Sequence, residues 1–192
     1  FEKEFKKLSE LAKTAMQGSN RVKTIVNDLR MFSRLEDEKQ ESTKLAALIL
    51  STVHLVRTQY DDIEFEVDCP FDPSLTCYPA KLSQVFMNVI VNACQAIEAR
   101  IEREPELKGK IYVSMTEVDK HVIVSFEDNG SGMDDKTMQQ IFDPFYTTKD
   151  VGKGTGLGMS ISFGIIEEHQ GKINISSKVN AGTVIEVHLP VL

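Results

Sequence analysis

Residues 85–97 read VFMNVIVNACQAI, and this segment indicates how the chain folds. It belongs to an apolar stretch over about 79–103, so we expect a long buried helix there. Its polar residues Asn88, Asn92 and Gln95 are spaced four and three apart, which places them on one stripe of the helix. Buried amides need hydrogen-bond partners. The stripe fits bonds to neighbouring loops and fits equally a polar pocket in which Asn oxygens coordinate a hard cation such as Mg²⁺.

On either side of this helix, segments with helical and strand periodicity alternate. Helical spacing occurs at 44–60, 134–141 and 158–170, and strand alternation occurs at 63–67, 110–118, 121–127, 172–177 and 182–189. A loop is expected between them at 142–157. This order predicts an α+β fold, in which a mixed sheet carries helices on one face.

The first part of the chain has a different period. Apolar or small residues step alternately by three and four through Leu8, Leu11, Ala15, Gly18, Val22, Ile25, Leu29 and Phe32. Such a narrow stripe is typical of a coiled coil or helical bundle, so we expect a helix over about 3–35 that needs partner helices. A polar linker is expected at 37–43, which divides the chain into 1–36, the linker and a globular part at 44–192.

Composition limits the class of protein. The chain has 192 residues, which is enough for one hydrophobic core, and 27% of them are charged. Its net charge of -7 and its lack of a Lys/Arg-rich block argue against nucleic-acid binding. Its three cysteines form no C-x-x-C pair, which favours reduced thiols. Because the chain begins at Phe1, we expect it to be a piece of a longer protein.

Residues 127–133 read EDNGSGM and follow a predicted strand. Asp128 is a carboxylate at a strand end, where it can accept a hydrogen bond from an amino group such as that of adenine. Gly130 and Gly132 allow a ligand to approach the backbone closely. The alternative is an ordinary turn rich in Asn and Gly.

Residues 152–159 read GKGTGLGM, with glycine at every second position. The spacing fits neither a Walker loop nor G-x-G-x-x-G. The loop leads into the helix that begins near Gly158, whose backbone N–H groups suit phosphate binding. Lys149 and Lys153 add local positive charge in an acidic chain.

Taken in order, five segments resemble the N, G1, F, G2 and G3 boxes of the histidine-kinase ATPase family. They are NVIVNA, DNGSGM, DPFYTTK, GKGTGLGMS and the AGT at 181–183. The resemblance covers about 42–192. RVKTIVNDLRMFSR at 21–34 is similar to the second helix of the dimerisation and phosphotransfer domain of these kinases. The short loop after DPFYTTK and the NACQAI ending look most like the nitrogen-regulation and dicarboxylate-sensing kinases.

This resemblance implies a Bergerat-type two-layer α/β sandwich that binds ATP with Mg²⁺ and releases ADP. It implies that Asp128 binds the adenine amine, that Asn92 and Asn88 hold Mg²⁺, and that Asn88 and Lys149 serve catalysis. The nucleotide-binding set that it implies is Asn92, Asp128, Gly130, Gly132, Met133, Thr148, Lys149, Lys153, Gly154, Thr155, Gly156, Leu157, Gly158 and Thr183. Residues 142–157 would form a lid over the nucleotide.

One feature departs from the family pattern. The family's phosphate-accepting histidine is followed by an acidic residue on the first bundle helix, and none of His54, His121, His169 and His188 fits that description. The resemblance therefore implies an acceptor upstream of Phe1, a full-length homodimer, and relay of the phosphate to an aspartate of a response regulator. It implies a cytoplasmic domain and leaves open whether the parent protein is anchored in the inner membrane.

Three other functions deserve comparison. Hydrolytic ATPase clamps of the chaperone and mismatch-repair type carry a Glu one turn before the metal-binding Asn, whereas position 88 is Asn. A serine-kinase relative acting on an anti-anti-sigma partner would not need the heptad helix. A nucleotide-binding pseudokinase has no support, because all the boxes are intact.

Overall fold

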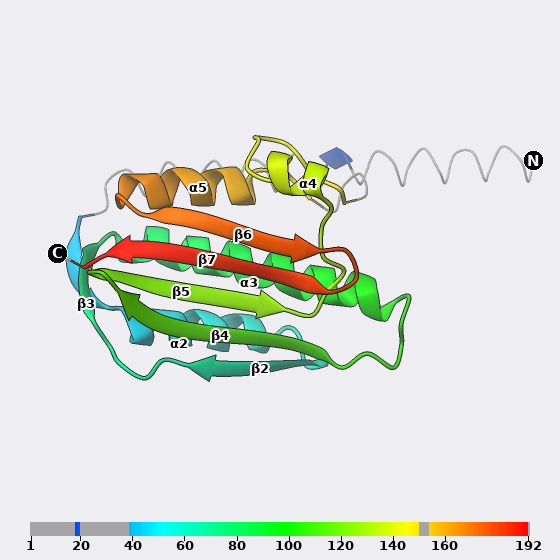
Figure 1. Cartoon of the computed structure of the whole chain (residues 1–192), viewed down its shortest axis with the longest axis horizontal. Helices are drawn as coiled ribbons and strands as arrows, with labels where there is room; N and C mark the ends of the chain where they lie inside the picture. Colours follow the sequence, from blue (N-terminus) through cyan, green and yellow to red (C-terminus); the bar gives the residue numbers. More distant parts are fainter. Residues whose placement is uncertain (1–17, 20–38, 150–153, 192) are drawn as a thin grey trace, which may run out of the picture.

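A computed structural model of the chain describes residues 18–19, 39–149 and 154–191 (Figure 1). Along the chain its elements are β1 (Glu41–Lys44), α2 (Leu45–Arg57), β2 (Ile63–Asp68), β3 (Ser74–Cys77), α3 (Pro79–Ile101), β4 (Gly109–Val118), β5 (His121–Asp128), α4 (Asp135–Gln140), α5 (Gly158–Glu168), β6 (Lys172–Lys178) and β7 (Gly182–Pro190). The helices and strands predicted from residue periodicity between 44 and 189 are all confirmed.

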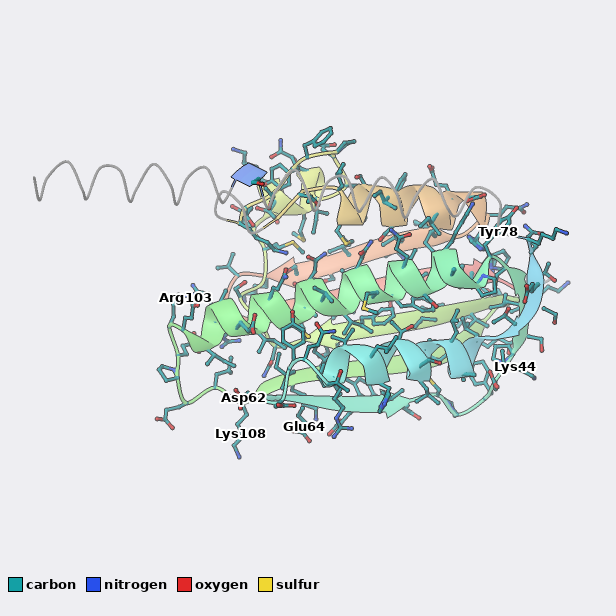
Figure 2. All side chains as sticks on the ribbon, turned by 180° about the vertical axis from the view of Figure 1, so that it is seen from behind. Lys44, Asp62, Glu64, Tyr78, Arg103 and Lys108 are labelled. Atoms are coloured by element: carbon teal, nitrogen blue, oxygen red, sulfur yellow. The ribbon has the colours of Figure 1, made fainter. Side chains whose placement is uncertain are left out.

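Within this part of the chain, five strands form one mixed sheet in the order β2-β4-β5-β7-β6. β2 pairs parallel with β4, and the other neighbours pair antiparallel. Figures 1 and 2 show α2, α3 and α5 side by side over one face of the sheet. The fold is therefore the predicted two-layer α/β sandwich with a mixed sheet.

The core lies between the helices and the sheet because β2, β4, β5 and β7 each bury every second side chain over much of their length. β5, for example, buries Val122, Val124 and Phe126. α3 buries its apolar stripe against them, and the rings of Phe86 and Phe126 lie 5.7 Å apart between centroids. Each large side chain fully buried in this way stabilises the fold by about 1.5–3 kcal/mol. The packing fixes α3 against the sheet, so its polar stripe has a defined direction.

α5 is attached to α3 at both ends, which positions the loop that precedes it. At its start, Asn88 of α3 bonds to Gly158. At its far end, Lys81 pairs with Glu168 at 2.7 Å, and the backbone N–H of Tyr78 donates to His169 Nε2 at 3.0 Å. His169 Nε2 can accept this bond only when its ring is neutral.

Two short strands were not predicted. Residues 41–43, assigned above to the linker, belong to β1, which pairs antiparallel with β3 outside the main sheet. β1 exposes three of its four side chains, so it lacks the apolar alternation that identifies a half-buried strand. Asp72 holds the ribbon to α2, since its carboxylate accepts from the Ala46 N–H at 2.9 Å. The folded part therefore begins by Glu41, three residues before the predicted boundary.

The predicted heptad helix over 3–35 lies outside the described residues, except for Gly18 and Ser19, which are helical and exposed. None of the helices in the described ranges is long and apolar enough to cross a membrane.

Candidate nucleotide-binding site

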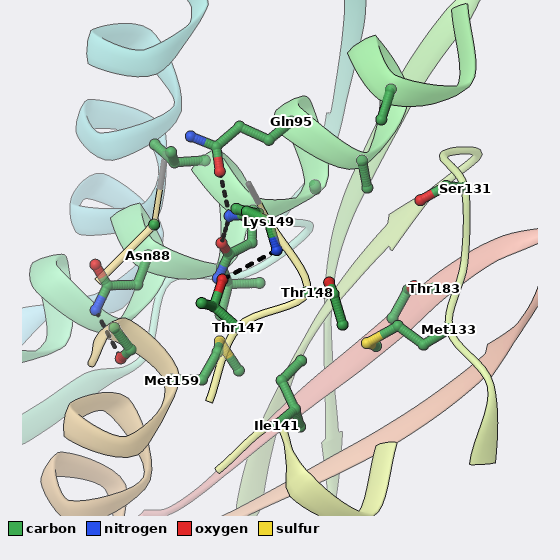
Figure 3. A pocket seen from close by; sticks show the side chains of 18 of the residues that line it. Asn88, Gln95, Ser131, Met133, Ile141, Thr147, Thr148, Lys149, Met159 and Thr183 are labelled. Atoms are coloured by element: carbon green, nitrogen blue, oxygen red, sulfur yellow. Dashed lines mark hydrogen bonds between the residues drawn. The ribbon is translucent and has the colours of Figure 1, made fainter. Parts of the chain in front are cut away.

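A cavity of about 940 Å³ opens beside α3, between the end of β5 and the start of α5 (Figure 3). Thirteen of the residues singled out from the sequence line it: Asn88, Asn92, Gln95, Asp128, Gly132, Met133, Thr148, Lys149, Gly154, Thr155, Gly156, Gly158 and Thr183. Gly130 and Leu157 do not line it, and Lys153 lies outside the described residues. The tertiary structure thus gathers segments that are up to 95 positions apart in the chain.

At one end of the cavity lies Asp128, the last residue of β5, whose side chain is 7% exposed. It accepts a hydrogen bond from the Gly130 N–H at 2.8 Å. Burial raises the pKa of this carboxyl to about 6, against the opposing effect of the Gly130 and Thr183 N–H groups. A carboxylate held in an apolar wall bonds strongly to a ligand that brings an N–H donor.

The turn after Asp128 requires glycine. Gly132 has φ +64, and a Cβ there would lie 2.0 Å from the carbonyl oxygen of Lys178. The Met133 N–H then donates to Ser177 Oγ, which also contacts Thr183 Oγ1 at 2.9 Å. The G1 turn is therefore fastened to the β6–β7 turn. Gly130 does not line the cavity, and its contribution is the backbone N–H that it donates to Asp128.

The loop before α5 closes another side of the cavity. Gly156 has φ +71, and its carbonyl oxygen accepts from the Phe145 N–H at 2.9 Å. A Cβ at Gly156 would lie 2.4 Å from the carbonyl carbon of Phe145, so no larger residue fits. Leu157 is buried, at 8% exposed, and does not line the cavity.

Asn88 lines the cavity and also bonds to the start of α5. Its Nδ2 donates to the Gly158 carbonyl oxygen at 3.0 Å and to Ser162 Oγ at 3.1 Å. These bonds hold the start of α5 on α3. Because both amide protons are used, the carboxamide oxygen is the atom that Asn88 can offer to a ligand. Ser162 was not singled out from the sequence, although a serine one turn after Gly158 in an apolar helix was a signal.

We expect Asn88→Asp to unfold at a lower denaturant concentration than the unchanged chain. The carboxylate cannot donate to the Gly158 carbonyl oxygen, so that bond is lost and the new charge faces a carbonyl oxygen, a change that costs about 1–3 kcal/mol. Urea unfolding without nucleotide measures the effect. The matched control is Asn180→Asp in the exposed turn between β6 and β7, which should change stability by less than about 0.5 kcal/mol. Equal stability of the two variants would contradict the role assigned to the Asn88 amide.

Lys149 reaches the amide stripe of α3 from the lid (Figure 3). Its ammonium donates to Asn92 Oδ1 at 2.8 Å and also to Gln95 Oε1. Burial lowers its pKa. Thr147 and Thr148 precede it along the cavity, and Thr148 is exposed. The cation is thus held by neutral amides in a partly dry site, an arrangement suited to receiving an anion.

The amide oxygens of Asn92 and Asn88 are also the candidate protein ligands for Mg²⁺. No cluster of three or more His, Cys, Asp or Glu side chains suited to a metal occurs in the described residues. A metal here would therefore depend on amide and ligand oxygens. Asn92 Oδ1 already accepts from a cation, the Lys149 ammonium, and the Asn88 oxygen lines the same cavity. Hard oxygen donors beside a phosphate site suit Mg²⁺, which usually keeps several waters and takes few protein ligands.

Several lining residues were missed by the sequence motifs. They are mostly apolar or small side chains, including Gln84, Ala96, Phe126, Ser131, Ile141, Tyr146, Thr147, Met159 and Ile185. Met133, Ile141 and Thr183 lie together near the Asp128 end of the cavity, where a flat apolar group would be buried (Figure 3). Met133 and Thr183 were singled out from the sequence, whereas Ile141 and the other missed residues belong to no pattern that distinguished them.

Comparisons with known proteins agree with this geometry. Residues 77–192 match the family described as "Histidine kinase-, DNA gyrase B-, and HSP90-like ATPase". Sporulation kinase E of Bacillus subtilis is 34% identical over 175 residues, 89% of this chain and 22% of that protein. Nitrogen regulation protein NtrY of Azorhizobium caulinodans is 31% identical over 157 residues, 79% of this chain and 19% of that protein. The chain thus spans about a fifth of the length of these curated relatives.

A solved structure is also similar. The catalytic domain of histidine kinase ThkA superposes with a TM-score of 0.67 at 30% identity, over 80% of this chain and 96% of that one. The similarity therefore takes in nearly the whole of that catalytic domain.

Proposed function

Because the chain belongs to the family of histidine kinase-, DNA gyrase B- and HSP90-like ATPases, we propose that it is the ATP-binding catalytic domain of a sensor histidine kinase. In this proposal it transfers the γ-phosphate of ATP to a histidine upstream of Phe1. A response regulator aspartate then receives the phosphate. The named kinases among the relatives support this class over the other branches of the family.

The observation that carries the proposal is the polarity of the cavity. A buried carboxylate, Asp128, lies at one end, and the Lys149 ammonium is held on neutral amides at the other. Adenine carries an amino donor and ATP ends in a polyanion, so the two ends complement the two ends of ATP. Phosphoryl transfer needs mainly positioning and charge neutralisation, which these residues supply.

We further propose the roles of the individual residues. Asp128 accepts from the adenine amine, beside Gly132, Met133 and Thr183. Asn92 and Asn88 hold Mg²⁺ through their carboxamide oxygens, and the metal when bound neutralises charge on the phosphate oxygens. The remaining phosphate contacts belong to the lid, through Thr148, Lys149, Lys153 and the backbone of 154–158.

The proposal assigns 1–36 to the second helix of the dimerisation and phosphotransfer bundle. The partners would be that domain, a second copy of the kinase and a response regulator. The domain would work in the cytoplasm.

The hydrolytic ATPase reading has less support. Its water-activating base would stand at position 88, and there Asn88 donates both amide protons to groups of α5. An amide with that bonding cannot take a proton from water.

The deciding experiment supplies ATP radiolabelled on the γ-phosphate, this chain, and a separate dimerisation domain that carries the acceptor helix. Acid-labile, base-stable label on the histidine of that domain supports the proposal. Label on a serine, or release of free phosphate without transfer, would replace it with another branch of the family.

We also expect the lid at 142–157 to exchange its amide hydrogens fast without nucleotide and slowly with ATP and Mg²⁺. Alternate glycines provide few side chains whose packing offsets the entropy of ordering. Hydrogen exchange followed by mass spectrometry measures this, with the β4–β5 hairpin as an internal reference that should not change. Equal protection of the lid in both states would contradict a nucleotide-gated lid.

A further inference from the structure

The amide stripe of α3 holds a cation that belongs to the lid. Asn92 and Gln95 are three residues apart on one face of the helix, and both direct their carboxamide oxygens at the Lys149 ammonium (Figure 3). The sequence placed Gln95 on the polar stripe, but the family resemblance gave it no binding or catalytic role. The contact joins residues 54 positions apart, so it depends on the lid folding back onto α3.

Because the partners of Lys149 are neutral, its ammonium can leave them for another partner. A carboxylate would trap a half-buried ammonium as an ion pair, whereas two amide oxygens give charge-assisted bonds without opposing charge. The same Asn92 oxygen is the atom proposed above as a Mg²⁺ ligand. An oxygen about 2.1 Å from Mg²⁺ cannot also keep a lysine ammonium at hydrogen-bond distance without strong repulsion between the two cations.

We infer that Gln95 is a positioning residue that holds Lys149 on Asn92 in the nucleotide-free protein, so that Lys149 and Mg²⁺ exchange places when nucleotide binds. The inference rests on the proposed function for the metal. When Mg²⁺ takes the Asn92 oxygen, the ammonium moves toward the phosphates. Gln95, one turn farther along α3, keeps it within reach. Lys149 thus occupies the metal position before nucleotide binds and contacts the phosphates afterwards.

The test replaces Gln95 with Met, which has similar length and helix propensity but no comparable acceptor. The first readout is the gain in ADP affinity caused by Mg²⁺, measured by calorimetry as the ratio of Kd with EDTA to Kd at saturating Mg²⁺. Because Gln95→Met removes one of the two acceptors that hold the competing ammonium, it should raise this ratio by about five- to thirty-fold, the range expected for one charge-assisted bond. Gln95→Glu should lower it, because the added carboxylate retains Lys149.

The double variant shows whether Gln95 acts through Lys149. In a Lys149→Met background, Gln95→Met should change the ratio by less than two-fold, about the experimental scatter of such cycles. Lys110→Met, on the exposed Lys110–Glu66 pair of the sheet, is the matched lysine control and should leave the ratio unchanged. A full-size Gln95→Met effect without Lys149, or no effect in its presence, would overturn the inference.

A second readout needs neither metal nor nucleotide. In the free chain, Gln95→Met should make the Lys149 ammonium protons exchange faster with water, as seen by NMR of the lysine Nζ groups. Unchanged exchange would overturn the inference without touching the proposed function. Absence of ADP binding by the unchanged chain, with or without Mg²⁺, would instead overturn the proposed function.

Discussion

Asp128→Asn should weaken ATP binding by roughly 30- to 1,000-fold while leaving the domain folded. The adenine amine needs an acceptor, and the carboxylate offers one in a wall where its side chain is 7% exposed. An amide replaces a charge-assisted bond with a neutral one, and its NH₂ group brings a donor where the cavity needs an acceptor. These two effects together cost about 2–4 kcal/mol.

The same substitution should stabilise the nucleotide-free fold. The pKa of Asp128 is raised from 3.8 to about 6, so the folded state binds the proton more tightly than the unfolded chain. The stability contributed by the protonated form is complete below about pH 4 and is lost as the pH rises through about 6. Above that pH the buried charge costs roughly 3 kcal/mol, and Asn removes most of this cost while still accepting from the Gly130 N–H.

Calorimetric titration with a non-hydrolysable ATP analogue and urea unfolding at pH 8 measure both effects. The matched control is Glu117→Gln, an exposed carboxylate of β4 that is not among the groups that shift the Asp128 pKa. Adenosine, which has no phosphate to titrate, should also lose affinity for the unchanged chain below about pH 6. Unaltered affinity in Asp128→Asn would mean that Asp128 does not bind the adenine.

The chain alone should bind ATP without labelling itself, and its hydrolysis should fall far below the ~10 per second of a median enzyme. None of its four histidines lines the cavity, and His169 uses Nε2 to accept from Tyr78. Within the described residues, the γ-phosphate therefore has no histidine at the cavity to receive it. A positioned general base is worth about 10²–10⁴ in rate, and Asn88 cannot act as one.

Adding an intact dimerisation domain that carries the acceptor helix should restore acid-labile, base-stable labelling of its histidine. Asn92→Ala is the negative arm, because it removes the proposed metal ligand and an acceptor of Lys149. Arg57→Ala, on the exposed end of α2, is a surface control that should transfer phosphate normally. Rapid hydrolysis by the chain alone would favour an ATPase clamp instead.

The elements of the main sheet and the helices over it were predictable because each has one buried face. Burial of one face imposes a period of two on strands such as β5 and a helical period on α3. The placement of Asp128 was predictable for a similar reason. Asp128 lies between a strand and two glycines, so its position at the strand end depends on residues close to it in the sequence.

The features that escaped prediction all depend on contacts between distant segments. β1 is mostly exposed, and β3 has only four residues, two of them buried, so neither strand carries a long apolar alternation, and pairing across 30 or more residues defines them. Asn88 and Lys149 were assigned to metal and phosphate by the family resemblance. Their bonds to Ser162 and Gln95 arise because α5 and the lid pack back onto α3, 54 to 74 positions away along the chain. Local periodicity predicts which side of a segment is buried. The hydrogen-bond partner of a buried amide depends instead on how distant segments pack together, which only the tertiary structure determines.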